Sequence, residues 1–229
     1  MIKAAHTLLN AGFSIIPTGA DKRAAISSWK PFQSRLMTSD EAEEHFTNGA
    51  RLAIIGGKVS GNLECLDFDD PTIYEPFHEL LQMRCPGLLR KLTVRRQTPS
   101  GGYHVIYRCS SPVAGSLKLA MNPGVDEEGN YKEDTRIETR GEGGYFLSAP
   151  SEGYKVLSGS MIDCPTLTAE EVAAIHTTAK AFDLRESPKG RNSTRTTDTT
   201  DSPGSQFNQA HQVADILEAK GWKEDRQIG

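Results

Sequence analysis

The sequence is short of cysteine, of long apolar runs and of excess basic charge, and each shortage excludes a class of protein. Its four cysteines are Cys65, Cys85, Cys109 and Cys164, which include no Cys-x-x-Cys pair. This spacing argues against a secreted disulfide framework and a cysteine-based zinc site, so we expect reduced thiols and no zinc. No apolar run approaches the roughly 20 residues that span a bilayer, and the first residues lack a signal-peptide pattern. We therefore expect a cytoplasmic protein with no membrane partner.

Acidic residues slightly outnumber basic ones, since 30 Asp and Glu against 26 Lys and Arg give a net charge of −4. Proteins that bind nucleic acid often carry a basic face, so this balance counts mildly against such binding. A catalytic acidic cluster would lower the same sum, and local charge matters more than the total. Net charge therefore neither favours nor excludes a nucleic-acid partner.

Strand-like and helix-like segments alternate along most of the chain, with tight turns between strands. Thr38 with Glu41, and Thr168 with Glu171, form capping boxes that predict the starts of two helices. A proline and paired glycines at 98–102 join two strand-like runs and predict a hairpin. Hairpins mixed with helices favour an α+β fold over a doubly wound parallel sheet.

Three local expectations depend on weaker patterns. An N-terminal helix should be closed by Gly12, and the strand-like run after it should end at Pro17. The polar stretch over 121–134 is expected to be a loop.

The composition changes near residue 187, where Ser, Thr, Asp, Pro and Arg replace apolar residues. Such a segment buries too little apolar surface to offset the entropy of ordering, so we predict a disordered linker over 186–205. It separates a folded domain over 1–185 from a segment over 206–229 that regains helical periodicity. We expect this last segment to be the truncated start of a further region.

Asp67 and Asp69 lie two residues apart in a predicted strand, so their carboxylates project from the same face. Leu66 and Phe68 then point to a core on the other face. Adjacent carboxylates repel each other, and a divalent cation relieves that repulsion. Acidic residues that merely face solvent would give the same pattern.

The turn Ser100-Gly101-Gly102 leads directly to His104 at the start of the next strand. Glycines let backbone N–H groups approach an anion, and the serine adds a hydroxyl donor. Together with the imidazole, these groups suit a triphosphate. An ordinary hairpin turn with a structural histidine is the alternative.

Alternation over Arg136-Ile137-Glu138-Thr139-Arg140 places Glu138 and its two flanking arginines on one face. A third metal carboxylate with cations suited to phosphate or DNA is one interpretation. A solvated face with paired charges is the other.

These motifs occur in an order that resembles the archaeo-eukaryotic primase superfamily, and most closely its bifunctional primase–polymerase branch of plasmids and phages. The ordered features are Asp-x-Asp, then Ser-Gly-Gly-x-His, then a strand glutamate followed by Gly-Gly-Tyr and Ala-Pro-Ser. Upstream, Ile16-Pro17 through Lys22 and Trp29 resembles a family segment, although Arg23 stands where the family has a proline. The similarity extends over about residues 11–155.

The resemblance implies a role for each motif. The metal-binding and catalytic acids are Asp67, Asp69 and Glu138, which would hold two Mg²⁺ or Mn²⁺ ions. With the residue patterns above, it indicates a nucleotide-binding set of Lys22, Ser100, Gly101, Gly102, His104 and Arg140. The expected fold is a two-part module with an RRM-like antiparallel or mixed sheet and flanking helices.

The resemblance also implies a function and partners. Residues 1–185 would be a primase–polymerase catalytic domain, and residues 206–229 would lead toward a helicase domain or subunit. The partners would be a DNA template or primer and an NTP or dNTP, during phage or plasmid replication in the cytoplasm of a bacterial host. A metal-dependent nuclease and a catalytically inactive DNA-binding module are the alternatives.

Overall fold

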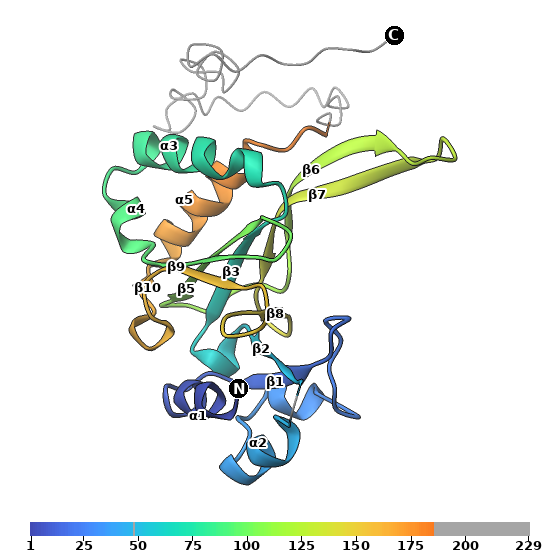
Figure 1. Cartoon of the computed structure of the whole chain (residues 1–229). Helices are drawn as coiled ribbons and strands as arrows, with labels where there is room; N and C mark the ends of the chain where they lie inside the picture. The colour runs from blue at the N-terminus through green and yellow to red at the C-terminus, as the bar shows by residue number, and fades with distance from the viewer. Residues whose placement is uncertain (48, 186–229) are drawn as a thin grey trace, which may run out of the picture. The chain divides into compact units, whose positions relative to one another are not determined.

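Two β-sheets organise the part of the chain that this computed structural model describes, residues 1–47 and 49–185 (Figure 1). The smaller sheet is antiparallel and has the strand order β1-β2-β8. Its strands are β1 Ile15–Thr18, β2 Arg51–Ile55 and β8 Tyr145–Leu147. Helices α1 (Ile2–Asn10) and α2 (Ser39–His45) share its hydrophobic core.

The larger sheet has seven strands and the order β6-β7-β3-β5-β4-β9, with β10 added to β5 in parallel. Its strands are β3 Leu63–Phe68, β4 Val94–Gln97, β5 Tyr103–Cys109, β6 Lys118–Val125, β7 Tyr131–Arg140, β9 Lys155–Ser158 and β10 Thr166–Leu167. The remaining α-helices are α3 Tyr74–Arg84, α4 Leu88–Lys91 and α5 Ala169–Lys180. Short 3₁₀ helices cover Lys30–Gln33, Lys58–Ser60, Pro71–Ile73 and Met161–Asp163.

Strand β3 separates two environments because its side chains alternate between the faces of the larger sheet. Phe68 points toward α3, where its ring centroid lies 5.1 Å from that of Phe77. On the opposite face, Leu63 and Cys65 belong to the hydrophobic core that contains the smaller sheet. The smaller sheet therefore lies against the face that α3 and α5 leave uncovered (Figure 1).

Several expectations from the sequence are confirmed. Helices and largely antiparallel sheets make the α+β fold that was predicted. Both capping boxes are present, at Thr38 and at Thr168. Helix α1 ends at Asn10, two residues before Gly12, which has the left-handed φ of 79° that favours glycine.

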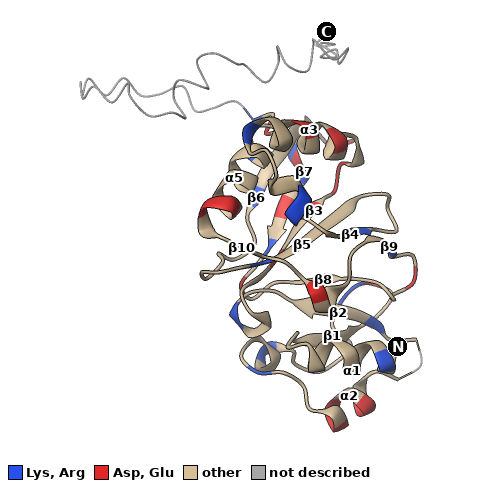
Figure 2. Cartoon of the chain, turned by 90° about the vertical axis from the view of Figure 1, so that its left-hand side faces the viewer, with Lys and Arg blue, Asp and Glu red and all other residues tan. Residues whose placement is uncertain are grey.

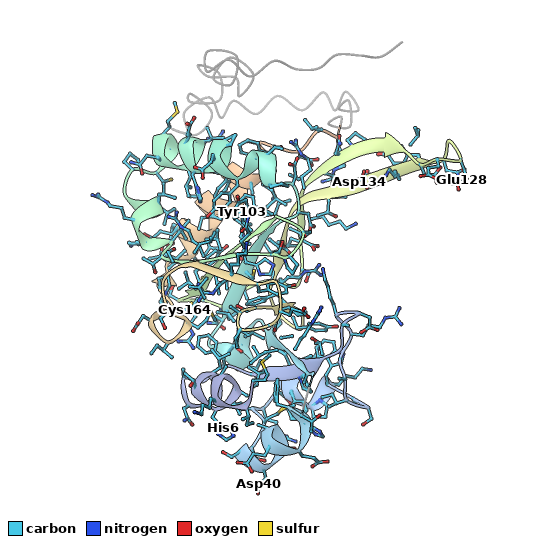
Figure 3. All side chains as sticks on the ribbon, in the orientation of Figure 1. His6, Asp40, Tyr103, Glu128, Asp134 and Cys164 are labelled. Atoms are coloured by element: carbon cyan, nitrogen blue, oxygen red, sulfur yellow. The ribbon has the colours of Figure 1, made fainter. Side chains whose placement is uncertain are left out.

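The loop expected over 121–134 is wrong, because this stretch forms most of the antiparallel hairpin β6–β7. Asp126 closes the turn, since its Oδ1 accepts the backbone N–H groups of Glu128 (3.0 Å) and Asn130 (2.8 Å). The outer hairpin projects from the domain and bears exposed polar side chains such as Glu128 and Asp134 (Figure 3). A two-stranded ribbon in solvent needs no apolar face, so its polarity resembled that of a loop.

Strand β1 also runs one residue beyond its predicted end, through Pro17 to Thr18. It is an edge strand, where the missing N–H of a proline is tolerated. All four cysteines carry free thiols. None of the helices within the described residues has the length and apolar character needed to cross a membrane. The linker predicted over 186–205 and the segment over 206–229 lie outside those residues.

The cap of α5 gives a test of the fold. Thr168→Ala should lower the free energy of unfolding by roughly 1 kcal/mol, because the side chain that accepts the Glu171 N–H is lost. Thr177→Ala is the matched control, since Thr177 is exposed in the same helix and alanine favours helices. Urea unfolding should show a loss for the first variant and none for the second. Equal losses would contradict the assigned cap.

Candidate active site

One row of polar side chains crosses the larger sheet on the face that looks toward the smaller sheet. The register pairs Arg96 with His104, His104 with Asp67, Asp67 with Glu138, and Glu138 with Lys118. Directly opposed residues of antiparallel strands share a face. The row therefore brings together residues from β4, β5, β3, β7 and β6 that are far apart in the sequence.

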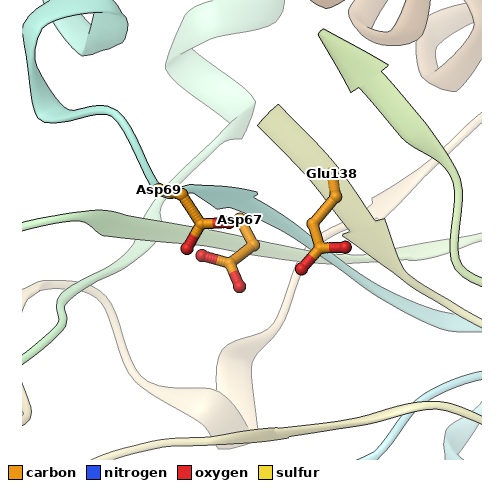
Figure 4. Close-up of side chains that lie close together, drawn as sticks. All are labelled: Asp67, Asp69 and Glu138. Carbon is orange, nitrogen blue, oxygen red and sulfur yellow. The ribbon is translucent and has the colours of Figure 1, made fainter. Parts of the chain in front are cut away.

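Three carboxylates form a cluster near the middle of this row (Figure 4). Asp67, Asp69 and Glu138 each offer a carboxylate oxygen, and these oxygens lie within 4.8 Å of one another. Asp67 and Glu138 are nearly buried, with 9% and 8% of their surfaces exposed, whereas Asp69 follows the end of β3 and is exposed. The sequence predicted this set, and the structure brings all three together.

The cluster is electrostatically unfavourable on its own. Although Asp69 is exposed as a residue, partial desolvation of its carboxyl group raises its pKa, and the negative charge of Asp67 adds to the rise. Burial likewise raises the pKa of Glu138, with Arg140 opposing and the two aspartates reinforcing the change. Hard carboxylate oxygens held close against their own repulsion fit a cation such as Mg²⁺ or Mn²⁺.

Two basic side chains partly offset the negative charge. Arg140 forms an ion pair with Glu138 through Nη2. His104 places Nε2 at 3.3 Å from Oδ1 of Asp67, and the residue is 3% exposed. His104 Nδ1 has no hydrogen-bond partner among the residues that the structure describes. The structure therefore places the imidazole of His104 in direct contact with the acidic cluster.

The turn between β4 and β5 requires its two glycines for different reasons. Gly101 has a φ of 94°, which favours glycine, and its N–H donates to the carbonyl of Thr98. A Cβ on Gly102 would lie 2.3 Å from the carbonyl oxygen of Phe68, at the end of β3. The N–H of Gly101 is thus used inside the turn. Ser100 keeps its hydroxyl at the surface, 3.1 Å from that of Thr98.

A cavity of about 450 Å³ lies between the acidic cluster and the smaller sheet. Most of the residues predicted for the site line it, namely Lys22, Asp67, Asp69, Ser100, His104 and Arg140. Gly101, Gly102 and Glu138 are not among its lining residues.

Sequence reasoning missed an aromatic part of the cavity wall, formed by Trp29, Tyr145 and Tyr154. Burial raises the pKa of Tyr154 to about 12, with Asp67 contributing, so this phenol stays protonated at neutral pH. Trp29 and Tyr145 are in contact, with ring centroids 5.1 Å apart. Two signals in the sequence pointed toward this wall, the Gly-Gly-Tyr motif and Trp29 in the upstream segment that resembles the family, whereas Tyr154 had none.

Basic residues are not confined to one element of the described chain. Lys and Arg are interspersed with Asp and Glu over the described chain (Figure 2). Lys22, Arg140 and His104 are the basic side chains that line the cavity. Local positive charge therefore meets the acidic cluster at the cavity, although the net charge of the chain is −4.

Comparison with known protein families finds a match to this chain. The family model described as "Bifunctional DNA primase/polymerase, N-terminal" matches residues 5–175. The match includes both sheets and every residue of the cavity wall named above. No curated protein matches the chain.

The repulsion within the cluster gives a test of the site. Asp69→Asn removes one of the crowded charges, so it should raise the midpoint of thermal unfolding without metal, because the ionised form is disfavoured in the fold. The same change should weaken Mn²⁺ binding, measured by calorimetry. Asp134→Asn, on the exposed part of β7, is the control and should change neither quantity. Lower stability with unchanged Mn²⁺ affinity in the Asp69 variant would contradict the site.

Proposed function

This chain belongs to the bifunctional DNA primase/polymerase family, and we propose that it is a DNA-dependent nucleotidyl transferase that extends or synthesises primers on a DNA template. One observation carries the proposal beyond the family. Asp67, Asp69 and Glu138 form one cluster. Two of these acids, Asp67 and Asp69, line the same cavity as Lys22, Ser100, His104 and Arg140, so the acids lie next to groups that can bind phosphate.

The three acids would hold two divalent cations, Mg²⁺ or Mn²⁺. When bound, such ions would activate the primer 3′-hydroxyl by lowering its pKa, and they would stabilise the negative charge on the pyrophosphate leaving group. Asp67 and Glu138 project from paired positions of neighbouring strands, so the sheet fixes their separation before any ligand binds. His104 supports the geometry by restraining the Asp67 carboxylate through Nε2. The chain contributes mainly positioning and electrostatics, which are the principal requirements of phosphoryl transfer.

The incoming NTP or dNTP would bind in the cavity. Lys22 and Arg140 bring positive charge and Ser100 a hydroxyl donor toward the triphosphate. Gly101 and Gly102 would act through the shape of the turn, because Gly102 lets it approach the end of β3 closely. The Trp29–Tyr145 pair adds a large apolar surface to the same cavity, suited to the non-phosphate part of the nucleotide.

The wider context is part of the proposal and is suggested by the resemblance of the motifs to the plasmid and phage branch of the family. Residues 1–185 would form the catalytic domain, and residues 186–205 and 206–229 would connect it to a helicase domain or subunit. The primer and template would lie across the cleft between the two sheets. We place this activity in replication of a phage or plasmid, in the cytoplasm of a bacterial host.

Primer extension tests the proposal directly. Wild-type protein with Mg²⁺ or Mn²⁺ should extend a labelled primer with NTPs or dNTPs, and EDTA should stop the reaction. Asp67→Ala and Glu138→Ala should each reduce extension by roughly two orders of magnitude or more, because a charge-stabilising group is lost. Asp134→Ala is the matched control, since Asp134 lies in the same strand as Glu138 but on the exposed hairpin.

The same gel separates the alternatives. Unprimed templates run beside primed ones show whether synthesis starts without a primer. Metal-dependent shortening of the labelled strand, lost in Asp67→Ala, would indicate a nuclease instead. Extension that persists in both alanine variants would show that the acidic cluster is not the catalytic site.

A further inference from the structure

The turn that carries Lys22 is exposed, yet its backbone adopts a conformation that few side chains favour. Lys22 has a φ of 65°, in the left-handed region where glycine is usual. The turn itself is tight, because the N–H of Gly19 donates to the carbonyl of Arg23 (2.9 Å) and the N–H of Lys22 donates to the carbonyl of Gly19 (3.1 Å). Contacts must hold Lys22 in this conformation, and these two bonds leave its own carbonyl free to accept another donor.

Tyr145 supplies that donor from a distant part of the sequence. Its hydroxyl donates to the carbonyl of Lys22 at 3.2 Å, across 123 residues. The tyrosine is itself fixed, since it begins β8 and pairs with Ile55 of β2. Its hydroxyl is therefore presented by the sheet, whereas the carbonyl that receives it belongs to an exposed turn.

The ring of Tyr145 holds the same segment at a second point. Trp29 packs edge-on against it, with centroids 5.1 Å apart, and Trp29 follows Lys22 by one short stretch of chain. One tyrosine thus anchors the segment from Lys22 to Trp29 at both ends, through the hydroxyl at one end and the ring at the other. All three residues line the cavity beside Asp69.

We propose that Tyr145 is a positioning residue for Lys22. Its hydroxyl fixes the turn so that the Lys22 ammonium stays in the cavity wall, where it meets the triphosphate of the incoming nucleotide. This inference rests on the proposed function, which it extends by assigning a role to a tyrosine of the smaller sheet. Because the hydroxyl acts through Lys22, its removal weakens nucleotide binding and leaves the chemical step largely unchanged.

A double-mutant cycle on nucleotide binding tests the inference. Calorimetry with dATP and with ATP, in Mg²⁺ and without DNA, gives Kd for wild type, Tyr145→Phe, Lys22→Ala and the double variant. Tyr145→Phe keeps the ring against Trp29, and we expect a Kd about 3- to 10-fold higher, the range for one lost hydrogen bond. In the Lys22→Ala background the same change should have no further effect. Tyr131→Phe, on the exposed hairpin, is the matched control and should bind as wild type does.

Two further readouts separate positioning from general damage. In primer extension, Tyr145→Phe should raise KM for the nucleotide and leave kcat near the wild-type value. Trypsin should cut after Lys22 or Arg23 faster in Tyr145→Phe than in wild type or Tyr131→Phe, because the turn has lost an anchor.

The outcomes distinguish this inference from the proposed function. Wild-type affinity in Tyr145→Phe, or equal weakening by that change with and without Lys22, overturns the positioning role while leaving the transferase intact. Unchanged trypsin cleavage at the turn overturns it as well. Absence of nucleotide binding to the wild-type protein overturns both the inference and the function on which it rests.

Discussion

The pairing of β3 with β5 on one side and β7 on the other determines where every acid of the site lies. A slip of one residue would turn Asp67 toward α3 and expose the opposite set of side chains. Burial of Leu66 and Phe68, both 0% exposed, opposes that slip. Each such side chain contributes about 1.5–3 kcal/mol when fully buried, so the hydrophobic core of one face fixes the charges of the other.

This arrangement concentrates negative charge that the fold alone does not neutralise. Burial and mutual repulsion raise the pKa of Asp69 and of Glu138, while Arg140 and His104 supply only partial compensation. The core-forming alternation of β3 thus stabilises the domain and creates a place where a cation relieves repulsion. At these few positions, the carboxylates that favour cation binding lower the stability of the fold when no cation is bound, and such shifted pKa values are common at functional sites.

Local pattern was enough to predict several of the elements, and the order of the motifs pointed to the three acids. Alternation in β3 gave the common face of Asp67 and Asp69, and the capping boxes gave the starts of α2 and α5. The sequence did not reveal the Tyr145–Lys22 contact or the place of Arg96 in the row of side chains, because both depend on register between distant strands. The β6–β7 hairpin was missed for a different reason: its turn chemistry at Asp126 is local, but the outer parts of its strands are exposed and lack an apolar face.

The location of bound metal tests the account most directly. Crystals grown with Mn²⁺, a non-hydrolysable nucleoside triphosphate and a primed template would show the ions by anomalous scattering. We predict Mn²⁺ in direct contact with the carboxylates of Asp67, Asp69 and Glu138, with the triphosphate in the cavity beside Lys22 and Arg140. Manganese that contacts none of these carboxylates, or a nucleotide bound outside the cavity, would contradict it.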